Sequence, residues 1–266
     1  MAKFLRDEFL KNITVDGGCL DQINHFLIQR LLSFNSEVQS HEGKDTEVML
    51  ATYVIRFDNR GYKLNDFSEV KKYFDQATSI ERVIFTLDTA LSEKSNRMYG
   101  THYEVRLDAK DGNNSYIQVA SDDSDSVDAV FNGIMDIVSK GLNKNGYIRN
   151  TWSQLLVQVL GVAIGFFISL IAALKISPYI KIENSFVITF LFSFIMFSNA
   201  WGFINQQLLR FFDYSFPNIR FVQPGKSSLH WLLQAIVGGV IVALTLFLLN
   251  SGLGWVGKVL GPHIGG

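Results

Sequence analysis

The feature that most limits how this chain can fold is Leu155–Leu174, a run of twenty residues without a charged side chain. At about 1.5 Å of rise per residue, a helix of this length spans about 30 Å, which matches the hydrocarbon core of a bilayer. Small and polar side chains recur every three or four residues along one face of this helix, at Gln158, Gly161, Gly165 and Ser169. We therefore expect a transmembrane helix with one face that packs closely against another helix.

Two further uncharged runs of nineteen residues follow, Phe186–Ile204 and Trp231–Leu249. Gly239 lies between Ala235 and Ala243 at four-residue spacing and predicts a second helix-packing face, in the last of these runs. No Asp, Glu, Lys or Arg lies inside any of the three runs, which argues against a proton-coupled transporter. The sequence thus predicts an all-α membrane domain over residues 151–266, with spans at about 155–174, 186–204 and 231–249.

Basic residues near the ends of these spans predict the orientation. Three spans place the termini on opposite sides, and cytoplasmic loops carry the excess of Lys and Arg. The N-terminal side of the predicted spans holds Lys140, Lys144, Arg149, Arg210, Arg220 and Lys226, whereas the other side holds Lys175, Lys181 and Lys258. The lone cysteine and an N-terminus without an apolar signal segment agree with a cytosolic domain. We expect a multi-pass protein of the inner (cytoplasmic) membrane with a cytoplasmic N-terminus.

The front part, residues 1–150, has the charge density of a soluble domain and ends in a short polar connector. It holds 18 Lys and Arg against 23 Asp and Glu, a net charge of −5, while residues 151–266 hold 6 against 2. Because binding along a nucleic-acid backbone needs clustered Lys and Arg, the acidic front part argues against nucleic acid as a partner.

Alternating and helical patterns predict an α+β front domain with a mainly antiparallel sheet. Three helices and four strands are expected, and Glu47–Phe57 is apolar on both alternating sets, which predicts a central strand covered on both faces. Residues 101–108 and 115–120 alternate around the turn Asp111–Asn114 and form the clearest hairpin. The expected helices lie at about 20–34, 66–77 and 124–140, and the other strands at 82–88 and in the hairpin.

The first strand of this hairpin carries a polar row, His102, Glu104 and Arg106, on the set that alternates with its apolar residues. The alternation places this row on the exposed face of the sheet. Two interpretations remain open: the row is a solvated face, or it is a binding surface.

The sequence holds no pattern that predicts catalysis, a cofactor or a metal. Nucleotide-binding, metalloprotease and hydrolase motifs are absent, and Cys19 has no second cysteine for a zinc site or a disulfide. The carboxylates at Asp122, Asp123, Asp125 and Asp128 lack EF-hand spacing and are explained by a helix N-terminus. We expect no cofactor and no metal, and scattered catalytic residues are the remaining route to an enzyme.

The link between the second and third predicted spans, Gln207–His230, is rich in aromatic and basic residues. One interpretation places it in the lipid headgroup region, where basic groups meet anionic lipid. The other has its aromatic side chains cover the helix ends or the front domain.

Two hypotheses of function follow. The first is an integral membrane protein whose cytosolic sensing or binding domain anchors to, or signals to, an oligomerising helix bundle that acts as a membrane effector. Its partners would be the bilayer, a second copy or another membrane protein, and a cytosolic protein or small molecule. The alternative is a membrane-tethered enzyme with its active site in the front domain, which a deep pocket of converging polar side chains would favour.

Overall fold

The structure is a computed structural model that describes residues 4–40 and 48–225, together with residues 232, 235, 236, 238 and 239. The chain divides into two compact units, Met1–Lys226 and Ser227–Gly266. The predicted third span falls almost entirely outside the described residues.

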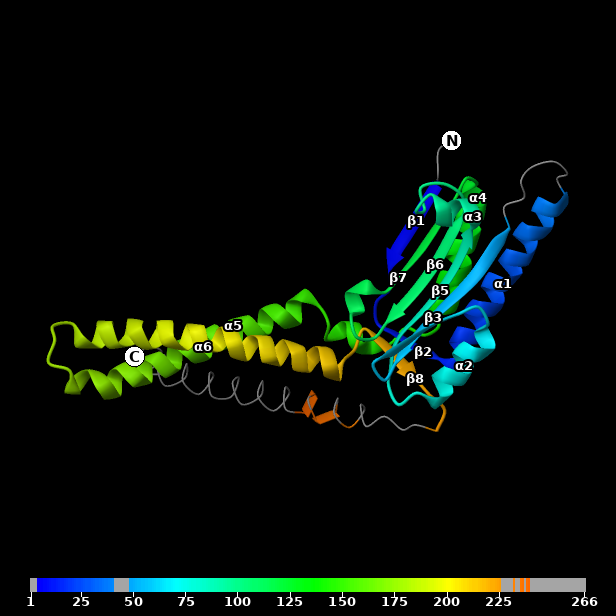
Figure 1. Cartoon of the computed structure of the whole chain (residues 1–266). Coiled ribbons are helices and arrows are strands. Elements are labelled where there is room, and N and C mark those ends of the chain that lie inside the picture. The colour runs from blue at the N-terminus through cyan, green and yellow to red at the C-terminus, as the bar shows by residue number, and fades with distance from the viewer. Residues whose placement is uncertain (1–3, 41–47, 226–231, 233–234, 237, 240–266) are drawn as a thin grey trace, which may run out of the picture. The chain divides into compact units, whose positions relative to one another are not determined.

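A six-stranded sheet organises the front domain (Figure 1). Its strand order is β1-β7-β6-β5-β3-β4, and every neighbouring pair is antiparallel. The prediction of an α+β domain with a mainly antiparallel sheet is therefore confirmed. The strands are β1 (Phe4–Phe9), β3 (Met49–Phe57), β4 (Arg60–Leu64), β5 (Ile80–Thr89), β6 (His102–Asp108) and β7 (Tyr116–Ser121).

The helices of this domain begin where the sequence offers capping side chains. Asp66 accepts a hydrogen bond from the backbone of Ser68 and starts α2, and Asp123 accepts two from the first turn of α4. The first helix is longer than expected at both ends. The helices are α1 (Gly17–Ser40), α2 (Phe67–Gln76), the short α3 (Ala90–Lys94) and α4 (Ser124–Ser139).

One face of the sheet carries the hydrophobic core. Phe85 and Val105 are fully buried on this face, and α1, α2 and α4 supply the facing side chains, as Ile23, Phe74 and Ile134 illustrate. The amphipathic helices thus bury their apolar stripes against one side of the strands. We call this the covered face.

The described residues form no such layer on the opposite side of the sheet, which corrects the expectation for the strand at Glu47–Phe57. This strand, β3, lies next to the edge strand β4, and its outward Leu50 is 65% exposed. Its two-sided burial was therefore wrongly predicted. The sequence analysis also missed four strands: β1, β4, and two short strands that pair with each other in parallel, β2 (Ile13–Asp16) and β8 (Ile219–Val222).

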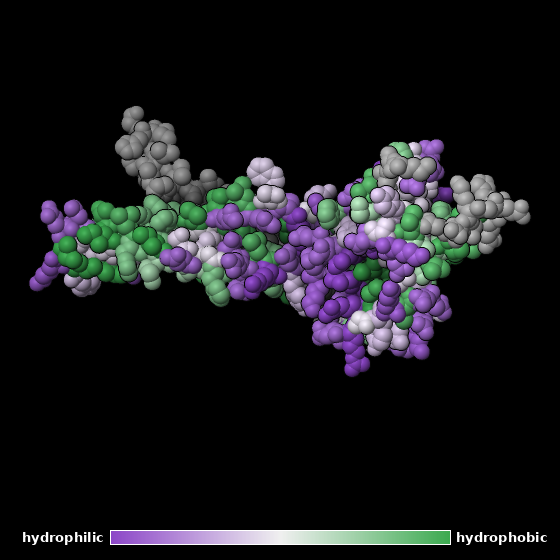
Figure 2. Space-filling view, turned by 45° about the horizontal axis from the view of Figure 1, so that its top comes forward, coloured by the Kyte–Doolittle hydropathy of each residue, from purple (hydrophilic) through white to green (hydrophobic). Residues whose placement is uncertain are grey.

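Two long apolar helices follow the domain, α5 (Thr151–Ile176) and α6 (Ser185–Ser215). They pack against each other as a hairpin, joined by a short 3-10 turn at Ser177–Tyr179. Both are long and apolar enough to cross a membrane, and only 17% and 6% of their most apolar windows is buried, unlike the core helix of a soluble protein. Figure 2 shows hydrophobic side chains over much of the visible surface of this pair.

Candidate functional site

The candidate site is the side of the sheet opposite the helices, which we call the open face. Cross-strand partners share a face, so the register places Glu104, Thr86 and Gln118 side by side there. Among the described residues, the open face has no helical layer comparable to the core, yet several of its charged side chains are buried. Buried charges need partners, and the open face supplies them in two groups.

The first group, the histidine cluster, consists of Asp88, Arg97, His102, Glu104 and Tyr116. The Nδ1 atom of His102 lies 2.6 Å from Asp88 Oδ1, and its Nε2 lies 3.5 Å from Glu104 Oε2. Arg97 NH2 lies 2.7 Å from the same Glu104 oxygen, and the Tyr116 hydroxyl donates to the other oxygen at 2.6 Å. The imidazole is thus held between two carboxylates.

These contacts shift the ionisation of the cluster in a consistent direction. Burial alone would raise the pKa of Glu104, but the nearby His102 imidazole, the hydrogen bond from Tyr116 and the charge of Arg97 lower that pKa to about 2. Burial alone would lower the pKa of His102, but Asp88 and Glu104 together raise it. Both shifts favour the charged forms of these groups, and the charges of two carboxylates, one imidazolium and one guanidinium balance.

This geometry corrects the predicted exposure of the polar row. His102 is 1% exposed and Glu104 is 5% exposed, whereas Arg106 is partly buried. The physical reason is the connection between β5 and β6, which supplies Arg97 to Glu104 and Ser92 to Asp88. Alternation along a strand predicts which face of the sheet a residue lies on, but not which other segments cover that face. A binding role for these three residues stays a prediction.

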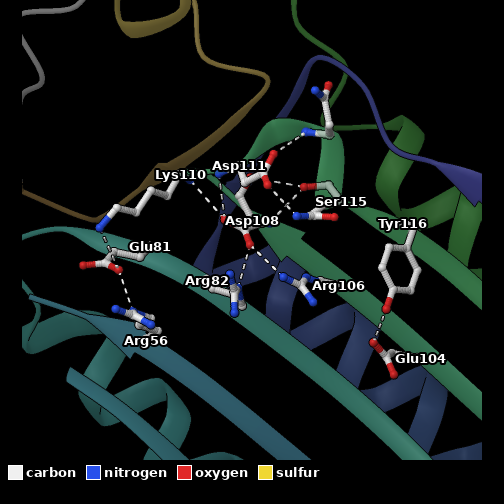
Figure 3. A network of polar contacts seen from close by, with 12 residues as sticks. Arg56, Glu81, Arg82, Glu104, Arg106, Asp108, Lys110, Asp111, Ser115 and Tyr116 are labelled. Atoms are coloured by element: carbon white, nitrogen blue, oxygen red, sulfur yellow. Dashed lines mark hydrogen bonds and ion pairs between the residues drawn. The ribbon is translucent and has the colours of Figure 1, made fainter. Parts of the chain in front are cut away.

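The second group, the arginine cluster, consists of Arg56, Arg82, Arg106 and Lys110 with the carboxylates Glu81 and Asp108 (Figure 3). A single oxygen of Asp108, Oδ2, lies 2.6 Å from Arg82 Nε and 3.2 Å from Arg106 NH2. One oxygen of Glu81 lies 2.8 Å from Arg56 Nε and 3.7 Å from Lys110 Nζ. Four cations therefore share two carboxylates.

Backbone groups hold both carboxylates of the arginine cluster in place. The amides of Lys110 and Asp111 donate to Asp108 Oδ1, and the amide of Asn59 donates to Glu81 Oε1. Burial would raise the pKa of Asp108, but the Asp111 amide and the guanidinium groups of Arg82 and Arg106 lower it. Both carboxylates stay ionised at neutral pH and fix the cations in position on the sheet.

A third feature, the joint, connects the domain to the end of α6. Residues 216–223 return from α6 to the domain, where β8 pairs with β2 and the Gln223 amide bonds the Ala77 carbonyl at the end of α2. The buried side chain of Asn218 is central: its Nδ2 donates to the carbonyls of Leu10 and Gly112 at 3.0 and 2.6 Å. Its Oδ1 accepts from the amide of Asn12 at 2.8 Å.

The joint also ties the two helices to each other. Arg149, just before α5, lies 2.9 Å from Asp213 of α6 and donates to the carbonyl of Phe216. Asn145 donates to the carbonyl of Pro217. A cleft of about 550 Å³ lies beside these contacts, lined by residues of the domain, of both helices and of the joint, among them Lys11, Asn113, Gln154, Phe212 and Asn218.

The joint includes part of the segment Gln207–His230, for which the sequence offered two interpretations. Its first part, up to Ser215, is helix, and Phe216 and Ile219 are buried. The Phe221 ring meets Phe74 of α2 at an edge-to-face angle of 77°. Of the two interpretations offered by the sequence, these contacts favour the one in which the segment covers the front domain.

The predicted helix-packing residues lie mostly at the contact between α5 and α6. Gly161, Gly165 and Ser169 are buried there, and a side chain at the two glycines would collide with Trp201 and Phe197 of the same chain. Gln158 is instead exposed. Gly239 belongs to the second unit, and no described atom lies within 4 Å of where its Cβ would be.

The remaining reactive groups do not form a second site. Burial and the nearby Asp16 raise the pKa of the Cys19 thiol to about 11, which keeps it protonated and a weak nucleophile at neutral pH. Among the described residues, no three His, Cys, Asp or Glu side chains gather as metal ligands.

The joint, Asp88 as a partner of His102, and every member of the arginine cluster except Arg106 were not predicted from the sequence. The signal for the arginine cluster was weak, because its members come from three separate stretches that only the sheet register brings together. Comparison of the chain with protein-family models, with curated proteins and with solved structures found no match.

Proposed function

We propose that this chain is a multi-pass protein of the inner membrane whose cytosolic α+β domain binds a ligand or partner and passes that binding to its membrane helices. The observation that carries the proposal is the joint. Residues 216–223 follow an apolar helix of 31 residues, yet they pair with β2 and bury Asn218 in the domain. A segment that served only as a tether would not need to pair with a strand of the domain or to bury a side chain in it.

The joint offers a physical route between domain and helices. The carbonyl of Gly112 lies in the β6–β7 turn, at the end of the open face, and Asn218 follows α6 by three residues. A ligand that moves this turn changes the contacts of the segment that leaves α6. Coupling of this kind needs two arrangements that the ligand distinguishes, and hydrogen bonds at a segment boundary allow such alternatives.

The proposed orientation rests on the basic residues near the span ends and has a direct test. A reporter active only outside the cytoplasm should be silent after Lys140 and active after Gly266. Activity after Lys140 would overturn the cytosolic placement of the domain. Silence at both positions would overturn the three-span topology.

The coupling is tested by hydrogen exchange on the full chain in native-like membranes. Asn218→Ala should increase exchange in the β6–β7 turn and in the last turn of α6 together, because it removes bonds to Leu10, Asn12 and Gly112. Asn113→Ala is the matched control, since Asn113 is an exposed asparagine of the same turn. Faster exchange confined to residues 216–223 would contradict the coupling.

A further inference from the structure

The arginine cluster holds more positive charge than its own carboxylates balance. Arg56 and Arg82 are direct cross-strand partners, an arrangement of like charges that destabilises a sheet unless counter-charges are present. Glu81 and Asp108 each serve two cations, which leaves an excess of two positive charges. This excess lies in a part of the chain, residues 1–150, whose net charge is −5.

The carboxylate of Asp111 in the β6–β7 turn does not cancel this excess. Asp111 turns its side chain toward its own loop, where it accepts hydrogen bonds from the Asn113 amide and the Asn114 side chain. Figure 3 shows it above Asp108 and pointing away from Arg82 and Arg106. The cations of the open face therefore have unused capacity for an anion.

The cations are placed so that a ligand can reach them. The side chains of Arg56 and Lys110 are 45% and 65% exposed, and those of Arg82 and Arg106 are partly exposed. The Nε atom of Arg106 is buried and has no hydrogen-bond partner among the described residues. An N–H group without a partner is costly to bury, so the guanidinium group of Arg106 is incompletely satisfied by its described neighbours.

We propose that the arginine cluster binds a phosphate-bearing anion on the open face of the sheet. Guanidinium groups present paired donors that match the oxygens of a phosphate, and a dianion matches the excess of two charges. The phosphate belongs either to a soluble metabolite or to a lipid headgroup. In both cases Arg56, Arg106 and Lys110 are the contacting side chains, while Asp108 and Arg82 position them.

This site deepens the proposed function and rests on it for its biological role, because it names the ligand class of the domain. Lys110 lies two residues before Gly112, whose carbonyl accepts from Asn218. A ligand held by Lys110 therefore acts on the β6–β7 turn close to the joint. Binding and coupling are measured separately, so failure of one is distinguishable from failure of the other.

The test measures the melting temperature of the full chain in nanodiscs. The first arm uses neutral phosphatidylcholine discs with added inorganic pyrophosphate as the soluble probe. The second arm compares phosphatidylcholine discs with discs that contain phosphatidylglycerol, without added pyrophosphate. The variants are Arg56→Gln and Arg106→Gln, and Lys72→Gln on α2 is the charge-matched control from the other side of the sheet.

We expect the wild type and Lys72→Gln to be stabilised in at least one arm, with an apparent affinity at least tenfold weaker in both arginine variants. Stabilisation in the first arm identifies a soluble phosphate, and stabilisation in the second identifies a headgroup. Arg56→Gln keeps the test valid if Arg106→Gln misfolds, because Arg56 is half exposed. No stabilisation in either arm, or equal stabilisation of all variants, would overturn the site.

Discussion

The two faces of the six-stranded sheet use the same strands for opposite purposes. On β5 and β6, Phe85 and Val105 point to the covered face and are fully buried among apolar side chains. The two neighbours of Val105 along the chain, Glu104 and Arg106, point to the open face and depend on ion pairs. The comparison teaches that apolar burial stabilises the covered face, whereas the buried charges of the open face are tolerated because ion pairs partner them.

The largest loss of stability should come from a substitution on the covered face. Phe85→Ala removes a ring packed against Tyr53 and Phe67, and we expect it to lower the free energy of unfolding by about 3–5 kcal/mol. The matched change on the open face, Val54→Ala, should cost about 1 kcal/mol or less, because Val54 is only half-buried. Native-state hydrogen exchange of β5 and β6 amides measures both. Equal costs would break the distinction between the faces.

An intermediate effect is expected at the buried carboxylate of the open face. Asp108→Asn removes the charge shared by Arg82 and Arg106 and should cost about 1.5–3 kcal/mol. Both guanidinium groups are partly exposed and regain some hydration, which limits the loss. The free energy of unfolding from hydrogen exchange is the measurement. A cost as large as that of Phe85→Ala would show that the open face also supports the fold.

In the helix hairpin, a glycine at the contact between α5 and α6 can be compared with a glycine outside that contact. Gly165→Leu places a side chain against Phe197 and should weaken the contact between α5 and α6 by about 1 kcal/mol or more. Gly202→Leu is the control, because no described atom lies within 4 Å of its Cβ position. Disulfide crosslinking between cysteines introduced on the two helices reports the contact. Identical crosslinking in both variants would place Gly165 outside the packing face.

The smallest effect near neutral pH concerns the histidine cluster. The pKa of Glu104 is lowered from 4.5 to about 2, so its contribution is present above pH 4.5 and is lost as the pH falls toward 2. The pKa of His102 is raised from 6.5, so its contribution is complete below pH 6.5 and is lost as the pH rises through the higher folded value.

Melting temperatures across this pH range should separate the two groups. Glu104→Gln should remove the acid-side dependence, and Phe85→Ala should lower every value while leaving the pH dependence unchanged. A Glu104→Gln variant that melts with the wild-type pH profile would show that the cluster does not control it.

Much of the fold could be predicted because periodicity is a local property. The helix at Ser124–Ser139 and the hairpin of β6 and β7 follow from the spacing of their own apolar residues. The strand β1 could not be recognised, because its outward Phe4, Leu5 and Phe9 stay exposed and give no clean alternation. Parallel pairing of β2 with β8 joins residues about two hundred positions apart, and no local pattern encodes it.

The candidate site was less accessible to sequence analysis than the fold. The alternation correctly placed His102 and Glu104 opposite the core, but their burial depends on Arg97 from a separate connection. Likewise, Arg56 and Arg82 become neighbours only through the register of β3 and β5. Charge clusters assembled across strands depend on tertiary pairing, so their residues look like ordinary surface charges in the sequence.

The central claim is that the segment after α6 is built into the α+β domain, and one crosslinking measurement tests it directly. Thr14 and Arg220 are paired residues of β2 and β8, and adjacent strands lie about 4.8 Å apart, within the range that a disulfide can bridge. Thr14→Cys with Arg220→Cys, in a Cys19→Ser background, should therefore form an intramolecular disulfide in native membranes.

The control pairs Thr14→Cys with Lys175→Cys at the far end of α5, about 36 Å along that helix from its start. The account predicts rapid, nearly complete oxidation of the first pair and none of the second, as measured by mass spectrometry of the linked peptides. A well-expressed protein in which the first pair stays reduced, or reacts no faster than the control pair, would contradict it.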